Sequence, residues 1–161
     1  MKSKYVILIS IFVFLIQSTI LQFFRIYGII PNISLVMIVT FTLIYGKKEG
    51  YIFAIGVGIL QDVFLSKALS INLIIYTSIV FIISLFYEKL FKDNFLTPII
   101  TIIFATFIYH IMFLLFMYLI GASINDLDFY KIILGEGIEN IVIITFIYGK
   151  IFPRVYDYNM R

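Results

Sequence analysis

Three carboxylates and one histidine interrupt the apolar segments of this 161-residue sequence, namely Asp62, Glu136, Glu139 and His110. A carboxylate inside an apolar helix of a membrane protein is costly, and it usually faces a bundle interior, a cavity or a partner. Asp62 ends such a segment, so one interpretation makes it a cation or proton relay or a ligand contact. The favoured interpretation is that Asp62 caps the turn at 66–72 or accepts hydrogen bonds from neighbouring backbone N–H groups.

Glu136 and Glu139 have i, i+3 spacing and therefore share one face of a helix. Such a pair could be catalytic or could bind a metal ion. Because Lys131 lies about one turn earlier, near the expected start of the last apolar segment, a solvated or salt-bridged helix start is favoured. Asn140 lies one turn after Glu136 and extends a polar face toward the interior.

His110 is the only histidine, and the chain has no cysteine, so a histidine or thiolate metal site has no second ligand of either type. A hydrogen-bonded packing histidine is favoured. A proton relay would require a carboxylate partner, for which Asp62 is the candidate. Asp62 and His110, together with Glu136, Glu139 and Asn140, define a hypothetical polar pocket.

Composition determines which elements must position these residues. The chain is 63% hydrophobic and 13% charged, far from the roughly half apolar and about one-quarter charged composition of soluble domains. We therefore predict one all-α integral membrane domain over residues 1–161, a compact bundle of about six transmembrane helices. The predicted spans are about 5–24, 32–45, 51–65, 69–87, 97–120 and 132–152. Nothing in the sequence supports nucleic-acid binding, and no catalytic residue, metal, cofactor or enzymatic activity is predicted.

The third predicted span carries a regular pattern of small residues. Gly50, Ala54, Gly58 and Asp62 recur at every fourth position and so form one stripe of a helix. Small residues allow helix backbones to approach closely in membranes. The stripe is therefore interpreted as a packing seam, and docking of a partner helix is the alternative.

Basic residues predict the topology of the chain. A polar turn is expected at 46–50, where Lys47, Lys48 and Glu49 would fix orientation and meet anionic headgroups or, alternatively, dock a cytoplasmic partner. Six spans place nine Lys and Arg residues on the side of both termini and three on the other side. The positive-inside rule then makes both termini cytoplasmic. The first span is expected to be retained rather than cleaved as a signal peptide, because no Ala-x-Ala-like site follows it.

Several motifs resemble those of the rod shape-determining protein MreD family, over nearly the whole chain. They are Pro31-Asn32, Lys47-Lys48-Glu49-Gly50, Gly58, Gln61-Asp62, Leu69, Asn72, Asn140 and Pro153. The sequence departs from the family pattern at Asn32, where Asp is common, and near Ala68 and Ser70, where Pro and Gly are common. These departures bear on the shape of the outer turn.

The resemblance implies a non-enzymatic scaffold of the bacterial cell-elongation machinery in the cytoplasmic membrane. Its implied partners are an MreC-like single-span protein, an MreB-like cytoskeletal protein and the lateral peptidoglycan synthases, besides the lipid bilayer. Whether the chain forms a homodimer is left open. The family is also similar in fold to the substrate-binding subunits of energy-coupling-factor transporters. The alternative function is therefore a subunit that binds a small, vitamin-like ligand, and a membrane enzyme ranks third.

Overall fold

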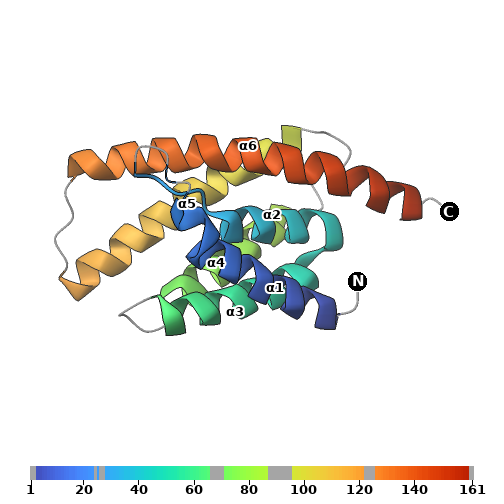
Figure 1. The fold of residues 1–161 in the computed structure, drawn as a ribbon, viewed down its shortest axis with the longest axis horizontal. Coiled ribbons are helices and arrows are strands. Elements are labelled where there is room, and N and C mark those ends of the chain that lie inside the picture. Colours follow the sequence, from blue (N-terminus) through green and yellow to red (C-terminus); the bar gives the residue numbers. More distant parts are fainter. Residues whose placement is uncertain are drawn as a thin grey trace.

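The computed structural model describes residues 3–23, 25, 28–65, 71–86, 96–121 and 126–159, with side chains except at 3, 126–128 and 152–159. These residues form an all-helical bundle, which confirms the predicted fold class (Figure 1). Its elements are α1 (Ser3–Ser18), the 3₁₀ helix η1 (Ile20–Phe23), α2 (Ile33–Tyr45), α3 (Lys47–Phe64), α4 (Ile71–Phe86), α5 (Leu96–Ile120) and α6 (Asp126–Asn159).

Three apolar helical segments of the described chain are long enough to cross a membrane. They are Lys4–Phe23, Leu96–Ile120 and Phe129–Ile151. Each exposes large apolar side chains, such as Phe12 on α1, Phe107 on α5 and Phe146 on α6. Continuous apolar faces of this kind are rare on soluble monomers, whereas in a bilayer they contact lipid. The structure therefore agrees with a membrane protein.

The short helix α2 is the centre of the bundle. Its 13 residues span about 20 Å, less than the roughly 30 Å of a bilayer core. It packs against all five other α-helices, and side chains such as Leu35, Val36 and Ile38 are fully buried. The segment before it is not helical, and Pro31 and Asn32 are buried in protein. Such backbone is tolerated at membrane depth only where protein surrounds it.

The predicted polar turn at 46–50 is wrong in its extent. Only Gly46 breaks the helices, with a φ of 92° that glycine adopts without strain. The backbone N–H of Gly50 donates to the carbonyl of Gly46 over 3.1 Å, so α3 already begins at Lys47. Glu49 lies in the first turn of α3, where a negative charge interacts favourably with the helix dipole.

The other predicted spans differ from the helices mainly at their ends. The second, fourth and fifth spans agree to within two residues, whereas α6 begins six residues before position 132 and continues past Pro153. The first span is divided between α1 and η1. Most of the turn predicted at 66–72 lies outside the described residues, as do several of the Lys and Arg residues counted for the topology, namely Lys2, Lys67, Lys89, Lys92 and Arg161.

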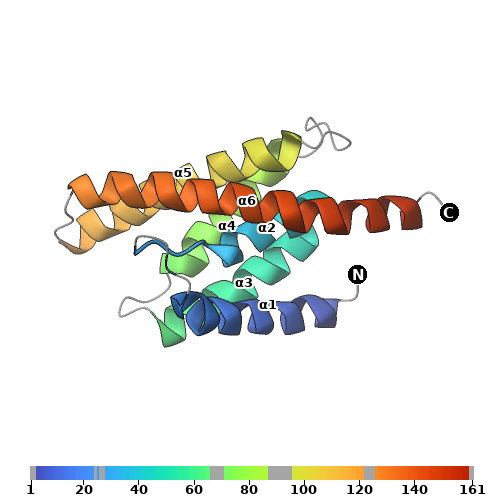
Figure 2. The same cartoon turned by 45° about the horizontal axis from the view of Figure 1, so that its top comes forward.

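The helices run up and down along the long axis of the bundle. The beginning of α1, the junction between α2 and α3, and the end of α6 lie at one end of the molecule, in both views (Figures 1 and 2). The opposite end holds the beginning of α6 and the end of α3. The beginning of α1 and the end of α6 thus lie at the same end of the bundle.

Candidate functional site

A cluster of polar side chains lies inside the bundle, where α2 and α4 begin, and receives residues from all six α-helices. We call it the polar cluster, and its members are Gln17, Asn32, Ser34, Gln61, Asp62, Asn72, Tyr76, Thr106, Tyr109, His110, Glu136 and Asn140. Buried polar groups are costly unless they are hydrogen-bonded. The contacts within the cluster therefore indicate what it does.

Asn32 joins three helices at the N-terminus of α2. Its side-chain Oδ1 accepts from the backbone N–H of Leu35 over 3.0 Å and so caps α2. The Tyr76 hydroxyl of α4 lies 3.3 Å from the same oxygen. The backbone N–H of Asn32 donates to Oδ1 of Asn140 on α6 over 2.9 Å. A capping residue thereby ties the central helix to α4 and α6.

A second chain of hydrogen bonds ties α1 to α4. Gln17 Oε1 accepts from the backbone N–H of Ser34 over 3.1 Å, and Gln17 Nε2 donates to the carbonyl of Pro31 over 3.3 Å. Gln61 Nε2 donates to Ser34 Oγ over 2.8 Å, and Gln61 Oε1 accepts from the Tyr76 hydroxyl over 2.8 Å. Gln17 thus satisfies the Pro31 carbonyl before α2 and the Ser34 N–H in its first turn, whereas Gln61 joins side chains of α2 and α4.

Asp62 holds the beginning of α4. Its Oδ1 accepts from the backbone N–H and from Nδ2 of Asn72, and its Oδ2 accepts from the backbone N–H of Leu73, each over 2.9 Å. These backbone groups belong to the first turn of α4, where N–H groups lack intrahelical partners and the helix dipole favours an anion. The geometry is that of the backbone-capping interpretation. The proposed relay between Asp62 and His110 is wrong, because the carboxylate nearest His110 is a different one.

His110 pairs with Glu136 instead. The distance from His110 Nε2 to Glu136 Oε2 is 3.2 Å, and the two residues are 4% and 7% exposed. The interpretation of Glu136 as part of a solvated helix start beside Lys131 is therefore wrong, because the helix begins earlier and Glu136 lies inside the bundle. Glu139 is partly exposed, and its Oε2 is buried without a hydrogen-bond partner among the described residues.

Asn140 connects this pair to the rest of the cluster. It is fully buried, its Nδ2 donates to Thr106 Oγ1 over 3.1 Å and to Glu136 Oε1 over 3.5 Å, and its Oδ1 accepts from Asn32. The structure thus brings together His110, Glu136 and Asn140 of the predicted pocket. Asp62 is linked to them only indirectly. It accepts from Nδ2 of Asn72, and Asn72 Oδ1 in turn accepts from the hydroxyl of Tyr109, the residue before His110, over 3.1 Å.

Replacing Asn140 with leucine should lower the stability of the bundle by about 1–3 kcal/mol, because the buried N–H of Asn32 would lose its acceptor. Asn140→Asp keeps this acceptor oxygen but replaces the donor to Thr106 with a carboxylate oxygen beside Glu136, so it should destabilise the bundle as well. The measurement is thermal unfolding in detergent, followed by circular dichroism because the chain has no tryptophan. Equal melting temperatures for wild type and Asn140→Leu would contradict this assignment.

The small-residue stripe lies inside the bundle. A Cβ atom at Gly50 would collide with the Thr42 side chain of α2, and one at Gly58 would lie 2.8 Å from Cα of Leu73 in α4. Ala54 is fully buried. The stripe therefore has the geometry of a packing seam. The alternative, docking of a partner helix, is wrong for this face because α2 and α4 already cover it.

Lys47 and Lys48 are exposed at the beginning of α3, at the same end of the bundle as the beginning of α1. They contribute nothing to the polar cluster, which lies closer to the other end of α3. Their position is compatible with both sequence interpretations, orientation in the membrane and contact with a cytoplasmic partner.

Sequence reasoning missed about half of the polar cluster. The sequence analysis does not single out Gln17, Tyr76, Tyr109 and Thr106. Tyr76 and Tyr109 stack with their ring centroids 5.7 Å apart, so they also read as ordinary core aromatics. Neutral polar residues at mid-span positions are the signal that would have found these residues, since each one needs a partner inside a membrane.

The described residues contain no group of three or more His, Asp or Glu side chains that could hold a metal ion. The polar cluster consists mainly of fixed hydrogen bonds between helices. Its most evident role is structural, because nearly every member holds one helix against another.

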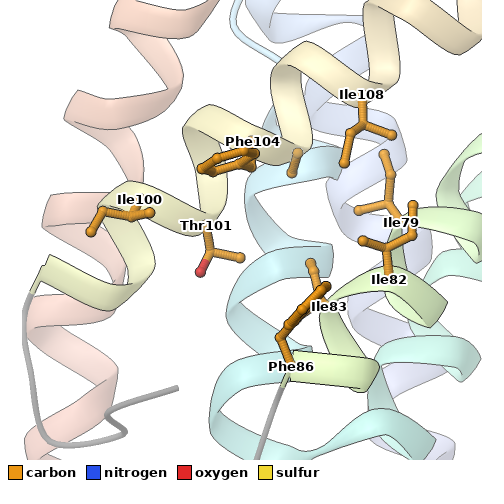
Figure 3. Close-up of a pocket in the computed structure, with 9 residues that line it drawn as sticks. Ile79, Ile82, Ile83, Phe86, Ile100, Thr101, Phe104 and Ile108 are labelled. Carbon is orange, nitrogen blue, oxygen red and sulfur yellow. The ribbon is translucent and has the colours of Figure 1, made fainter. Parts of the chain in front are cut away.

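A cavity of about 330 Å³ lies between the end of α4 and the beginning of α5 (Figure 3). It is lined by Ile79, Ile82, Ile83, Phe86, Ile100, Thr101, Phe104, Ala105 and Ile108. The Thr101 hydroxyl already donates to the carbonyl of Thr97. The cavity is therefore apolar, and it lies away from the polar cluster, in the opposite halves of α4 and α5. It lacks the converging polar groups that usually orient a vitamin-like ligand.

The fold and the polar cluster define a polytopic α-helical membrane protein whose polar interior joins short inner helices to long outer ones. The family model for the rod shape-determining protein MreD matches residues 1–152. The chain belongs to this family, as the sequence motifs indicate, and is a membrane protein of cell-shape determination. No curated protein and no solved structure matches the chain.

Proposed function

We propose that this chain is a non-enzymatic scaffold of the cell-elongation machinery in the bacterial cytoplasmic membrane. It would link an MreC-like single-span protein and an MreB-like cytoskeletal protein to the lateral peptidoglycan synthases. The observation that carries the proposal is the family match over residues 1–152, because the family is described by its effect on rod shape and not by a reaction.

The distribution of polar and apolar residues supports a scaffold. Most of the polar side chains inside the bundle are hydrogen-bonded to one another, whereas the outer faces of α1, α5 and α6 are apolar. The face of α6 that carries Leu134, Ile138, Val142 and Phe146 is an example, with each side chain more than 60% exposed. Such faces can accept lipid or the single helix of a membrane partner. Both termini and the beginning of α3 would lie in the cytoplasm under the positive-inside rule.

The proposal predicts that the tagged chain restores rod shape to a rod-shaped bacterium that lacks its own MreD protein. We expect it to co-purify from those membranes with the MreC-like protein. Replacing Lys47 and Lys48 with glutamine should leave this membrane partner bound and weaken recovery of the MreB-like protein if these lysines contact it. Lys150→Gln, which removes another exposed lysine, is the matched control.

Other outcomes would contradict the scaffold proposal. Recovery of a transporter ATPase in place of the MreC-like protein, together with a vitamin that raises the melting temperature, would favour the transport-subunit alternative. Cells that stay round although the folded protein reaches the membrane would contradict a role in elongation.

A further inference from the structure

The apolar cavity between α4 and α5 follows the direction of these two helices. Its α4 side extends from Ile79 to Phe86, and its α5 side extends from Ile100 to Ile108 (Figure 3). The lining residues of each helix are three or four positions apart, so each side is one helix face. At 1.5 Å per residue, each side is about 10–12 Å long. The cavity therefore runs along the membrane-spanning helices, as the hydrocarbon chains of a bilayer do.

The cavity is closed on its inner side by the core and borders the lipid-facing surface on its outer side. Ile79 and Ala105 of the lining are buried. Phe86, Ile100 and Phe104 also line the cavity but are 54%, 51% and 63% exposed. Phe86 is the last residue of α4, so this border begins where the helix ends. The cavity is thus continuous with a surface that the hydrocarbon of the bilayer covers.

The lining is chemically suited to hydrocarbon. Thr101 contributes its polar side chain, and the Thr101 hydroxyl already donates to the carbonyl of Thr97 over 2.7 Å. A buried water molecule needs several polar partners, and among the described residues the lining does not provide them. An empty cavity costs stability, because the atoms of its walls lack contact partners. An apolar occupant is therefore favoured over water and over a void.

The size of the cavity limits what this occupant can be. An apolar cavity of about 150 Å³ takes up one benzene molecule, which has six carbon atoms. A volume of about 330 Å³ therefore has room for roughly a dozen carbon atoms. A transmembrane helix, with a diameter of about 10–12 Å including its side chains, is too wide for it. A single hydrocarbon chain fits both the volume and the length.

We infer that the cavity binds one acyl chain of a membrane phospholipid, which completes the contact between α4 and α5. The chain enters from the lipid-facing surface beside Phe104, and the glycerol of the lipid lies near Phe86 at the end of α4. Hydrocarbon surrounds the protein in any case, so affinity comes from the fit of the chain between the two helices. Such a lipid should stay bound when the other lipids around the protein are washed away.

The test counts the phospholipids that the purified full chain retains in glyco-diosgenin, a steroid detergent whose rigid rings do not imitate an acyl chain. Native mass spectrometry should show one phospholipid per wild-type chain. Ile82→Trp places an indole in the cavity and should lower the retained amount about tenfold. Ile103→Trp is the matched control, because Ile103 of α5 is 47% exposed and does not line the cavity. It should retain lipid as the wild type does.

A second variant and a second measurement make the test independent of one substitution. Ala105→Phe fills the cavity from α5 and replaces Ile82→Trp should that variant not fold. Added phosphatidylglycerol should raise the melting temperature of the delipidated wild type by about 2–4 °C and leave the filled variants unchanged. Circular dichroism gives these melting temperatures.

Three results would overturn the proposal. The first is a folded wild type that retains no phospholipid. The second is equal retention by Ile82→Trp and Ile103→Trp. The third is a bound protein in place of the lipid, because the cavity would then receive a side chain of a partner.

Discussion

Replacing Gly58 with leucine is expected to prevent α3 and α4 from packing as they do in the wild type. A Cβ atom at position 58 would lie 2.8 Å from Cα and 3.2 Å from the backbone nitrogen of Leu73. Backbone atoms cannot rotate away as a side chain can, so the two helices must separate. Overpacking usually costs about 1–3 kcal/mol, and we expect at least the upper value here. Separation would also draw Asp62 away from the beginning of α4, which adds to the loss.

Gly137→Leu is the matched control for this change. Gly137 is also a helical glycine, on α6, but a Cβ atom there would meet nothing within 4 Å. Both substitutions raise helix propensity by a similar amount, so a difference between them reports packing. The measurement is the monodisperse fraction of a fluorescent fusion on size exclusion after heating. If Gly58→Leu were as heat-resistant as Gly137→Leu, the close approach of α3 and α4 would be wrong.

Replacing Asp62 with alanine should destabilise the bundle by about 2–4 kcal/mol. The substitution removes the acceptor of the backbone N–H groups of Asn72 and Leu73 at the beginning of α4. Loss of an N-terminal cap costs about 0.5–2 kcal/mol, and each donor left unpaired in a buried position costs about 1–3 kcal/mol. The interaction of the negative charge with the dipole of α4 is lost as well.

Asp62→Asn separates the two contributions to this effect. The amide keeps one acceptor oxygen but loses the charge and places an NH₂ group near a backbone donor, so we expect an intermediate loss of stability. Circular dichroism melts in one detergent would show the order wild type, Asn, Ala. A relay function would give another result, with both variants as stable as the wild type and only activity in the cell impaired.

The bundle could be predicted from the sequence because composition and apolar length determine it. Apolar runs such as 97–120 have few alternatives to a membrane helix, and their ends are marked by charges, glycine or proline. The beginning of α3 was misplaced because Lys47, Lys48 and Glu49 read as a loop, although charged residues are well suited to the exposed first turn of a helix. The predicted span at 132–152 is shorter than α6 at both ends, because apolar composition marks only the middle of that helix.

The polar cluster was only partly predictable, because sequence spacing gives the face of a residue on its own helix and not its partner on another. The i, i+4 spacing of Glu136 and Asn140 predicted that they share a face, and Asn140 Nδ2 donates to Glu136 Oε1. The pairing of His110 with Glu136, and of Asp62 with α4, depends on how the helices are placed side by side. Neutral residues such as Gln17 and Gln61 lack the charge that makes a buried residue conspicuous in a sequence.

The position of α2 has a consequence for how the protein responds to its lipid environment. Because α2 is surrounded by protein, its 13 residues do not have to match the thickness of the hydrocarbon layer. Adaptation to a thicker or thinner membrane falls instead to α1, α5 and α6, which can tilt at a modest cost. The interior that connects the six helices can therefore keep one geometry while its outer helices follow the bilayer.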